Sequence, residues 1–413
     1  MRIRSVAVMS NMEKALLIIL VMALYKFFFL FDGHSSLLVN GVYGPSTKTL
    51  DAISLLLLMS IVVTSKKIKK SKFFVEILIA ETIIIISAII TAPDVFLKKW
   101  ISYGVLLVLY FSLINYLKNK DQIVFFVTIM QLCGIVTNIL LISQAAIMNN
   151  GGNPFLHIYF LESGYWYPYR NGMLRITENE VLYLLTYCIS VSQIRISVSN
   201  KSSLKLIALM NITTTLINFF YVTQTRLIMM MAILILLINV FIRKKLTEKQ
   251  LFTRFVLIVG ASISAGFVYD KIMRGLRFSI TENSYIARIE GYKYFLNLGI
   301  EHPFMGVGFS DLLDANGINY TDVGIIGTFG QFGVILVFLY VIILIKLVYL
   351  TVKNQHGSFR MGRYISINSS FMVVFLSFTT MSMFNNGSLQ IFAVVLALIE
   401  SINRNTKIQN TKK

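Results

Sequence analysis

The stretch "GIIGTFGQFGVILVFLYVIILIKLVYL", residues 324 to 350, carries a single charged residue, Lys346, over its whole length. A helix needs roughly 20 consecutive apolar residues to cross a bilayer core about 30 Å thick. The stretch satisfies this requirement, and its apolar residues are continuous rather than confined to one face. It therefore predicts a membrane-spanning helix.

Runs of the same kind recur along the 413-residue chain, in which 56% of residues are hydrophobic and only 14% are charged. This balance is far from that of an ordinary soluble protein. We predict an all-α, polytopic integral membrane protein with about 12 transmembrane helices. The predicted spans are 14–31, 49–65, 73–92, 100–117, 122–148, 179–196, 205–222, 227–242, 252–269, 324–350, 364–383 and 387–402.

The formal net charge of +19 would suggest a nucleic-acid partner in a soluble protein. Here the basic clusters, such as "KKIKKSK" at 66–72 and "RKKLTEKQLFTR" at 243–254, fall between alternate predicted spans. The positive-inside rule assigns these segments, and both termini, to the cytoplasm. This topology explains the charge without nucleic acid.

Two predicted external loops, 149–178 and 270–323, are longer than ordinary connections. Loops longer than about 15 residues are commonly functional or disordered. The first is dense in aromatic residues, which suit sugar stacking, and it carries Arg170 and Arg175. External arginines act against the positive-inside rule, and anion binding is one reason for them. The whole chain, 1–413, is predicted to be one membrane domain bearing these loops.

The second loop contains a predicted short helix at 284–298, because apolar residues recur there at helical spacing. Asn283 or Ser284 is its expected N-cap, and Gly299 its expected end. Arg288 then lies in the first turns, where free backbone amides attract anions. The sequence "HPFMGVGF", 302–309, follows directly and indicates a tight turn.

Arg226 presents a similar arrangement in "YVTQTRLIMMM", 221–231. With Thr225 as the N-cap, Arg226 becomes the first residue of the next span, where a cation opposes the helix dipole by about 0.3–1 kcal/mol. A diphosphate would compensate, since arginine binds phosphate bidentately. The alternative is that Arg226 reaches a lipid phosphate at the membrane surface.

These features together resemble the Wzy-type polysaccharide polymerase and O-antigen ligase superfamily. The resemblance covers residues 223–350: an arginine after a span, a long external loop with Arg288, Tyr292 and the "HPFMGVG" sequence, then "GIIG" entering the next span. It implies transfer of glycan between polyprenyl-diphosphate carriers, the donor and the acceptor, on the external face of the bacterial cytoplasmic membrane. A flippase and chain-length regulators are the implied protein partners, beside membrane lipid.

The resemblance also implies roles for individual residues. Arg226 and Arg288 hold the leaving diphosphate as catalytic residues, and Arg175 supports one of the two carriers. Asp322 is the first choice for the carboxylate that accepts the hydroxyl proton, although it could equally cap the next helix. The remaining substrate-binding residues are Arg170, Tyr320 and Glu290, of which Glu290 is the second choice of base and also a possible charge partner of Lys293.

One departure favours a polymerase over a ligase. Family ligases carry a histidine shortly before the Gly-x-x-Gly segment, whereas this chain reads "NYTDVGIIG" there, with Tyr320, Thr321 and Asp322. The chain's histidines show no metal-ligand spacing, so no metal is expected, and no cofactor is implied.

The rival prediction is a lipid-linked oligosaccharide flippase or secondary transporter. Lys26, Glu76 and Glu81 lie within predicted spans, where buried charges often mark an ion path. The alternative for these residues is pairing between helices, with Lys26 as the partner of one of the acids.

Overall fold

The fold was analysed in a computed structural model of the chain. It describes residues 11–27, 52–61, 71–153, 155–156, 169–170, 173–174, 176, 180–196, 202–241, 250, 253, 256, 283–313, 323–355, 357, 359–379 and 388–410.

Helices account for nearly all of the described residues, which confirms the all-α prediction. The exception is a two-residue antiparallel ladder between β1 (Tyr169–Arg170) and β2 (Met173–Leu174). The helices are α1 (Asn11–Leu24), Ala52–Ile61, α3 (Phe74–Thr91), η3 (Pro93–Val95), α4 (Phe96–Tyr116), α5 (Lys120–Asn149), α7 (Glu180–Ile196), α8 (Ser202–Ile217), η4 (Asn218–Thr223), α9 (Arg226–Phe241), α11 (Asn283–Glu301), α12 (Gly324–Asn354), α13 (Arg360–Thr379) and α14 (Leu389–Asn410). Each predicted span overlaps one of these helices, or two in the case of 205–222, apart from 252–269, which lies largely outside the described residues.

Within the described residues, four helical segments are long and apolar enough to cross a membrane: Phe74–Thr91, Lys120–Asn149, Ser203–Thr223 and Gly324–Asn354. Between a third and a half of each is buried, so much of their apolar surface faces outward. Outward apolar surface on long helices is typical of contact with lipid rather than water. The chain is a membrane protein on this evidence of length and composition, while the number of crossings stays a prediction.

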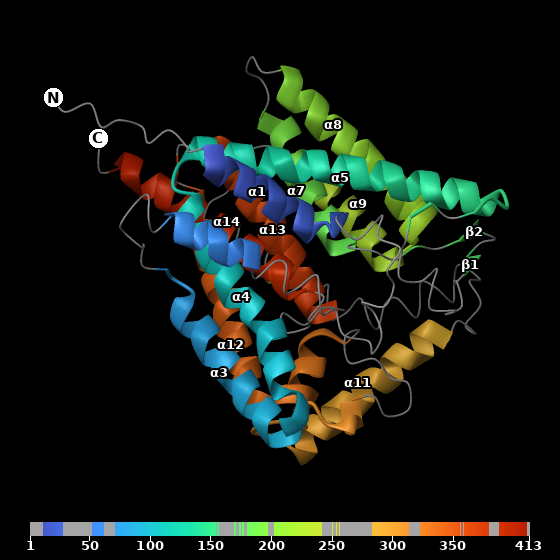
Figure 1. The fold of residues 1–413 in the computed structure, drawn as a ribbon, viewed down its shortest axis with the longest axis vertical. Helices are drawn as coiled ribbons and strands as arrows, with labels where there is room; N and C mark the ends of the chain where they lie inside the picture. The colour runs from blue at the N-terminus through green and yellow to red at the C-terminus, as the bar shows by residue number, and fades with distance from the viewer. Residues whose placement is uncertain are drawn as a thin grey trace.

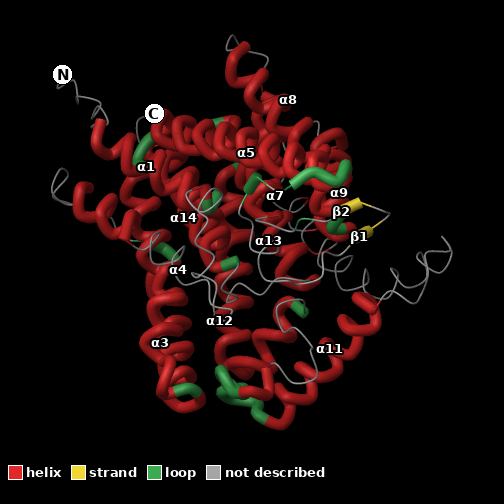
Figure 2. The backbone as a smooth tube through the Cα atoms, turned by 45° about the vertical axis from the view of Figure 1, so that its right-hand side comes forward, coloured by secondary structure: helices red, strands yellow, loops and turns green. Residues whose placement is uncertain are grey.

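The helices form two groups that run in different directions (Figures 1 and 2). α3, α4 and α12 make the lower group in both views, α5 and α7–α9 make the upper group, and α13 and α14 lie between them. α11 lies at the lower right and the β1–β2 hairpin at the right edge. Both elements belong to the two loops predicted to be external.

α12 agrees with the predicted span at 324–350 in position, but it is interrupted at one residue, which the sequence did not predict. Gly333 has φ 73° and ψ −175°, outside the helical region, and divides the element into a short first part and a longer second part. The second part, from Val334 to Asn354, has a length of about 31 Å at a rise of about 1.5 Å per residue. That length matches the bilayer core, so the second part alone is long enough to cross a membrane.

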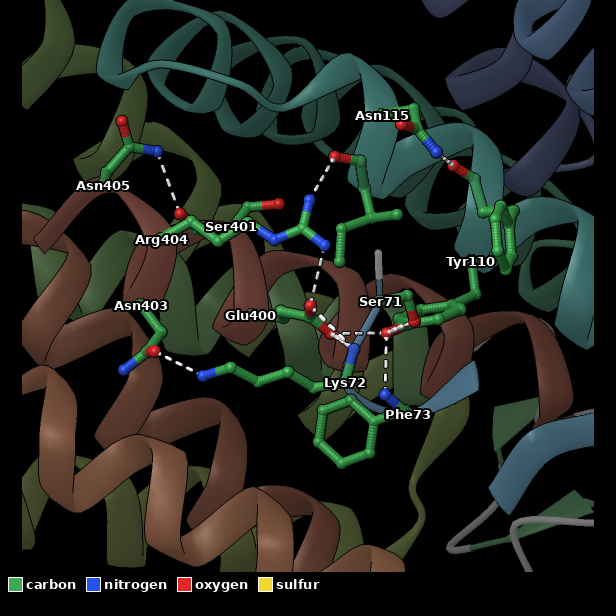
Figure 3. Close-up of polar contacts among 12 residues, drawn as sticks. Ser71, Lys72, Phe73, Tyr110, Asn115, Glu400, Ser401, Asn403, Arg404 and Asn405 are labelled. Atoms are coloured by element: carbon green, nitrogen blue, oxygen red, sulfur yellow. Dashed lines mark hydrogen bonds and ion pairs between the residues drawn. The ribbon is translucent and has the colours of Figure 1, made fainter. Parts of the chain in front are cut away.

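A second region of packing joins α14 to α3 and α4 at the ends predicted to face the cytoplasm (Figure 3). The fully buried Glu400 accepts hydrogen bonds from the Tyr110 hydroxyl at 2.5 Å, the Lys72 backbone amide at 2.9 Å and the Arg404 guanidinium at 2.9 Å. Lys72 also donates to Asn403 through its ammonium at 2.6 Å. Because Lys72 lies two residues before α3, this Glu400 network ties the start of that helix to α14.

Amide and hydroxyl side chains connect α5, α7 and α8 in the upper group. Gln131 donates to Ser190 at 2.7 Å and to Gln193 at 2.8 Å, and Asn211 donates to Ser190 at 2.9 Å. Farther along, Asn138 donates to Thr215 at 3.0 Å and accepts from Asn218. Such bonds stabilise the association of membrane helices, because apolar side chains are as well solvated by lipid as by another helix. We call these residues the amide seam: Gln131, Asn138, Ser190, Gln193, Asn211, Thr215 and Asn218.

One of the acids within the predicted spans forms an interhelical ion pair, which is the kind of contact that the alternative to an ion path predicted. Lys346 of α12 donates to Glu76 of α3 at 2.5 Å, so Lys346 rather than Lys26 is the described partner of this acid. Glu81 accepts from the Leu107 backbone amide at 3.0 Å. The ion pair supports a structural role for Glu76, and the transporter hypothesis stays the rival prediction.

Candidate functional site

The end of α8 winds into a π-helical segment, η4, immediately before Arg226. The Gln224 amide bonds the Phe219 carbonyl at 3.1 Å, and Gln224 itself adopts a left-handed conformation with φ 48° and ψ 30°. Left-handed backbone is uncommon for a residue other than glycine, asparagine or aspartate, and π segments recur at functional sites. The strained conformation of Gln224 therefore changes the direction of the backbone before α9.

α9 begins at Arg226, as the sequence predicted. Thr225 occupies the N-cap position, since its carbonyl accepts the first helical bond from the Met229 amide at 3.0 Å. Its hydroxyl, however, donates to Glu180 at 2.6 Å. Glu180 is the first residue of α7, so the N-terminal ends of α7 and α9 meet through this contact.

The first of the two loops predicted to be external is bound to the same place by its backbone. The Ile176 amide donates to the Val222 carbonyl in η4 at 3.0 Å. At the other end of the loop, Gln144 of α5 accepts from the Phe155 and Leu156 amides, both at 2.9 Å. The hairpin of β1 and β2 lies between these anchors, with Arg170 paired to Met173.

α11 confirms the helix predicted in the second loop but continues beyond the expected end at Gly299, to Glu301. Gly299 serves close packing instead of termination: a Cβ there would lie 2.3 Å from the Phe329 ring of α12. The helix ends where Pro303 follows, because the residue before a proline disfavours helical geometry.

The turn after α11 is held against the break in α12 almost entirely by backbone. Gly306 and Gly308 have φ of 62° and 64°, and a Cβ on Gly306 would lie 2.3 Å from the Gln331 carbonyl carbon. Only glycine permits this approach. We call this contact between 302–309 and 330–334 the glycine clamp; its hydrogen bonds are Val307 amide to Gly330 carbonyl, 3.0 Å, Gly308 amide to Gln331 carbonyl, 2.7 Å, and Val334 amide to Pro303 carbonyl, 2.7 Å.

The clamp also reaches the C-terminal end of α3 and the N-terminal end of α4. The Phe309 amide donates to the Thr91 hydroxyl at 2.8 Å. Its ring packs edge-on against Tyr103 and Phe332, and the Lys99 ammonium lies 4.8 Å from its centre. The sequence pattern "HPFMGVGF" and the glycines of "GIIGTFGQFG" are therefore two sides of one contact, which fixes α11 to the bundle.

The predicted site residues fall into three groups. Arg170 lies in the β1–β2 hairpin and Arg226 at the start of α9, and the Ile176–Val222 hydrogen bond joins the two segments that carry them. Arg288 lies on α11, which packs on α12. Glu290 is exposed on α11, and no ion pair joins it to Lys293 among the described contacts. Outside the described residues lie Arg175, Tyr320 and Asp322.

Glu180 was not predicted as a site residue, and the structure places it beside the start of α9. An acid in the first turn of a helix is usually read as a partner of the helix dipole, which conceals any other role. As for metals, no group of three or more histidine, cysteine, aspartate or glutamate side chains suited to an ion occurs in the part of the chain searched, the described residues. The absence of a metal from the chemistry stays a prediction.

Comparison with known proteins yields neither a match to any family model nor a similar curated protein.

Proposed function

We propose that this protein polymerises polyprenyl-diphosphate-linked oligosaccharide repeat units on the external face of the bacterial cytoplasmic membrane, making a surface polysaccharide. The observation that carries the proposal is the junction at the start of α9. There a π segment and a left-handed residue place Arg226 at a helix N-terminus, and backbone bonds bring the first external loop alongside. A helix N-terminus with an arginine suits a phosphate-bearing ligand.

The reaction that this arrangement supports is a glycosyl transfer. The acceptor hydroxyl oxygen forms a bond to the anomeric carbon of the donor, and the bond from that carbon to the diphosphate oxygen breaks. The hydroxyl proton passes to a carboxylate, and the departing lipid diphosphate takes the electron pair. Fixed cations aimed at the developing charge lower such a barrier by several kcal/mol.

The residue roles follow from this chemistry. Arg226 and Arg288 are proposed to hold the leaving diphosphate, and Arg175 the second carrier, while Arg170 and Tyr320 contact the glycan. Asp322 remains the first choice for the proton acceptor, with Glu290 the second, because a base must be close to the hydroxyl and ionised.

Loss of the protein in its host is expected to leave single repeat units on the surface and to remove long chains, as read by sizing the polysaccharide. In membranes supplied with lipid-linked units, Arg226→Ala and Arg288→Ala should each nearly abolish polymerisation. The double variant should be little worse, because two groups that act on one anion give non-additive losses. Arg226→Lys should also fall sharply, since lysine loses the planar fork.

Lys293→Ala is the matched control, because this cation is exposed on the same helix as Arg288 and has no role in the proposed transfer. It should leave chain length unchanged at equal protein abundance. Units stranded on the cytoplasmic side after loss of the protein would favour the flippase instead, and full polymer from Arg226→Ala membranes would return that residue to a lipid contact.

Glu180 is expected to position the turn before Arg226, because its carboxylate accepts a hydrogen bond from the Thr225 hydroxyl. Glu180→Leu should lower polymerisation by roughly tenfold, since hydrogen bonds to charged groups are worth about 1.5–3 kcal/mol. Glu180→Gln and Thr225→Ser keep an acceptor and a donor respectively, and each should retain most activity. If Glu180→Gln lost transfer while still binding the lipid-linked unit, Glu180 would be the proton acceptor itself.

A further inference from the structure

α11 has three distinct faces. The buried face packs on α12 through Phe295, Leu298 and Gly299. A second, polar face is formed by Glu290, Asn297 and Glu301, which are exposed and spaced seven and four residues apart, so they lie in one row.

The third face is apolar and also exposed. Leu296 is 43% exposed and Ile300 is 64% exposed, and their spacing of four residues places one above the other. Phe304, just beyond the helix, is 69% exposed. Exposing three large apolar side chains at intervals of four residues to water costs free energy. These side chains also lie on a different side of the helix from the polar row.

This apolar strip runs directly into the outward surface of α12. The Pro303 carbonyl accepts the Val334 amide at 2.7 Å, and a Cβ on Gly333 would lie 2.3 Å from the Phe304 carbonyl oxygen. From this contact onward α12 turns outward the large apolar side chains of Val334, Ile335, Phe338 and Ile345.

The depth of the strip follows from the break in α12. The second part of α12 matches the thickness of the bilayer core and begins at Val334, so the Pro303–Val334 bond lies near the outer boundary of that core. A helix whose end is fixed at this depth, with one apolar and one polar exposed face, has the pattern of a helix lying in the membrane interface.

We infer that α11 lies along the outer surface of the bilayer, with Leu296, Ile300 and Phe304 among the lipid acyl chains and headgroups and the Glu290–Asn297–Glu301 row in water. The bilayer is the partner because the strip is continuous with the outward face of a spanning helix. Lys293, exposed on the same helix, is long enough to reach lipid phosphate. This inference does not rest on the proposed function.

Single-cysteine variants in otherwise full-length protein test it, after Cys133 and Cys188 are changed to alanine. Two variants, Ile300→Cys and Leu296→Cys, place the label on the apolar face. Two matched controls, Asn297→Cys and Glu301→Cys, place it on the polar face of the same helix. Each variant is reconstituted into phosphatidylcholine–phosphatidylglycerol vesicles and labelled with an environment-sensitive fluorophore. Nitroxide-bearing lipids then quench any fluorophore that lies in the bilayer.

Fluorophores at 300 and 296 should be quenched severalfold more strongly than those at 297 and 301, and a charged, membrane-impermeant maleimide should show the reverse order of reactivity. Two results would overturn the inference. Equal quenching and equal reactivity on both faces would place α11 in water. Protection of Ile300→Cys from the maleimide without quenching by lipid nitroxides would show that protein, not lipid, covers the strip.

Discussion

Gly333→Ala should prevent most of the protein from accumulating in folded form. The φ and ψ of Gly333, 73° and −175°, belong to a region that side chains rarely adopt, at a cost of about 1–3 kcal/mol. The added Cβ would also lie 2.3 Å from the Phe304 carbonyl oxygen and 2.4 Å from its carbon. Relief requires separating the glycine clamp, which would expose unpaired backbone groups near the membrane boundary.

The measurement is thermal unfolding of the detergent-solubilised protein, followed by loss of its monodisperse peak in size-exclusion chromatography. Gly104→Ala in α4 is the matched control, because no atom lies within 4 Å of the new Cβ and alanine favours a helix over glycine by about 1 kcal/mol. The control should unfold at the same temperature or higher. An unchanged transition in Gly333→Ala would mean that the break in α12 is not required.

Glu400→Ala should destabilise the protein by about 3–5 kcal/mol, the usual effect of removing one partner of a buried ion pair. The substitution leaves the Arg404 guanidinium, the Tyr110 hydroxyl and the Lys72 amide without their common acceptor. It also releases the start of α3 from α14. A loss of this size is a large fraction of the free energy of unfolding of a typical domain, which is about 5–15 kcal/mol.

The same unfolding measurement checks this prediction, with two comparisons. Glu400→Gln keeps the shape and one acceptor oxygen, so its transition should fall between those of the parent and the alanine variant. Asp121→Asn alters an exposed carboxylate on α5 and should cost less than about 1 kcal/mol. A Glu400→Ala protein as stable as Asp121→Asn would show that the Glu400 network contributes packing only.

The helices were predictable because lipid imposes a strong constraint: an apolar run must satisfy its backbone internally, which a helix does. The break at Gly333 was not, because it depends on the bond from the Val334 amide to the Pro303 carbonyl, which lies in a turn about 30 residues earlier. Glycine within an apolar run is common in continuous membrane helices too. The π segment at Asn218–Thr223 likewise has a sequence that suits an ordinary helix equally well.

The site divides in the same way. The start of α9 at Arg226 and the helix carrying Arg288 followed from local capping and periodicity. The helix ends at Glu301, two residues beyond the expected end near Gly299, and Gly299 itself is required for close packing on Phe329. The Thr225–Glu180 contact joins the N-cap of α9 to the first residue of α7. These residues are far apart in the sequence, so no local sequence pattern predicts their contact.

The amide seam has a consequence for the order in which the chain enters the membrane during synthesis. The span built from α8 and η4 has a hydropathy of 1.5, the lowest of the four long apolar helices described, and carries Asn211, Thr215 and Asn218. Alone in lipid, these groups would lack partners. Their partners lie on α5 and α7, which leave the ribosome earlier, so a receiving surface already exists when this least hydrophobic helix arrives.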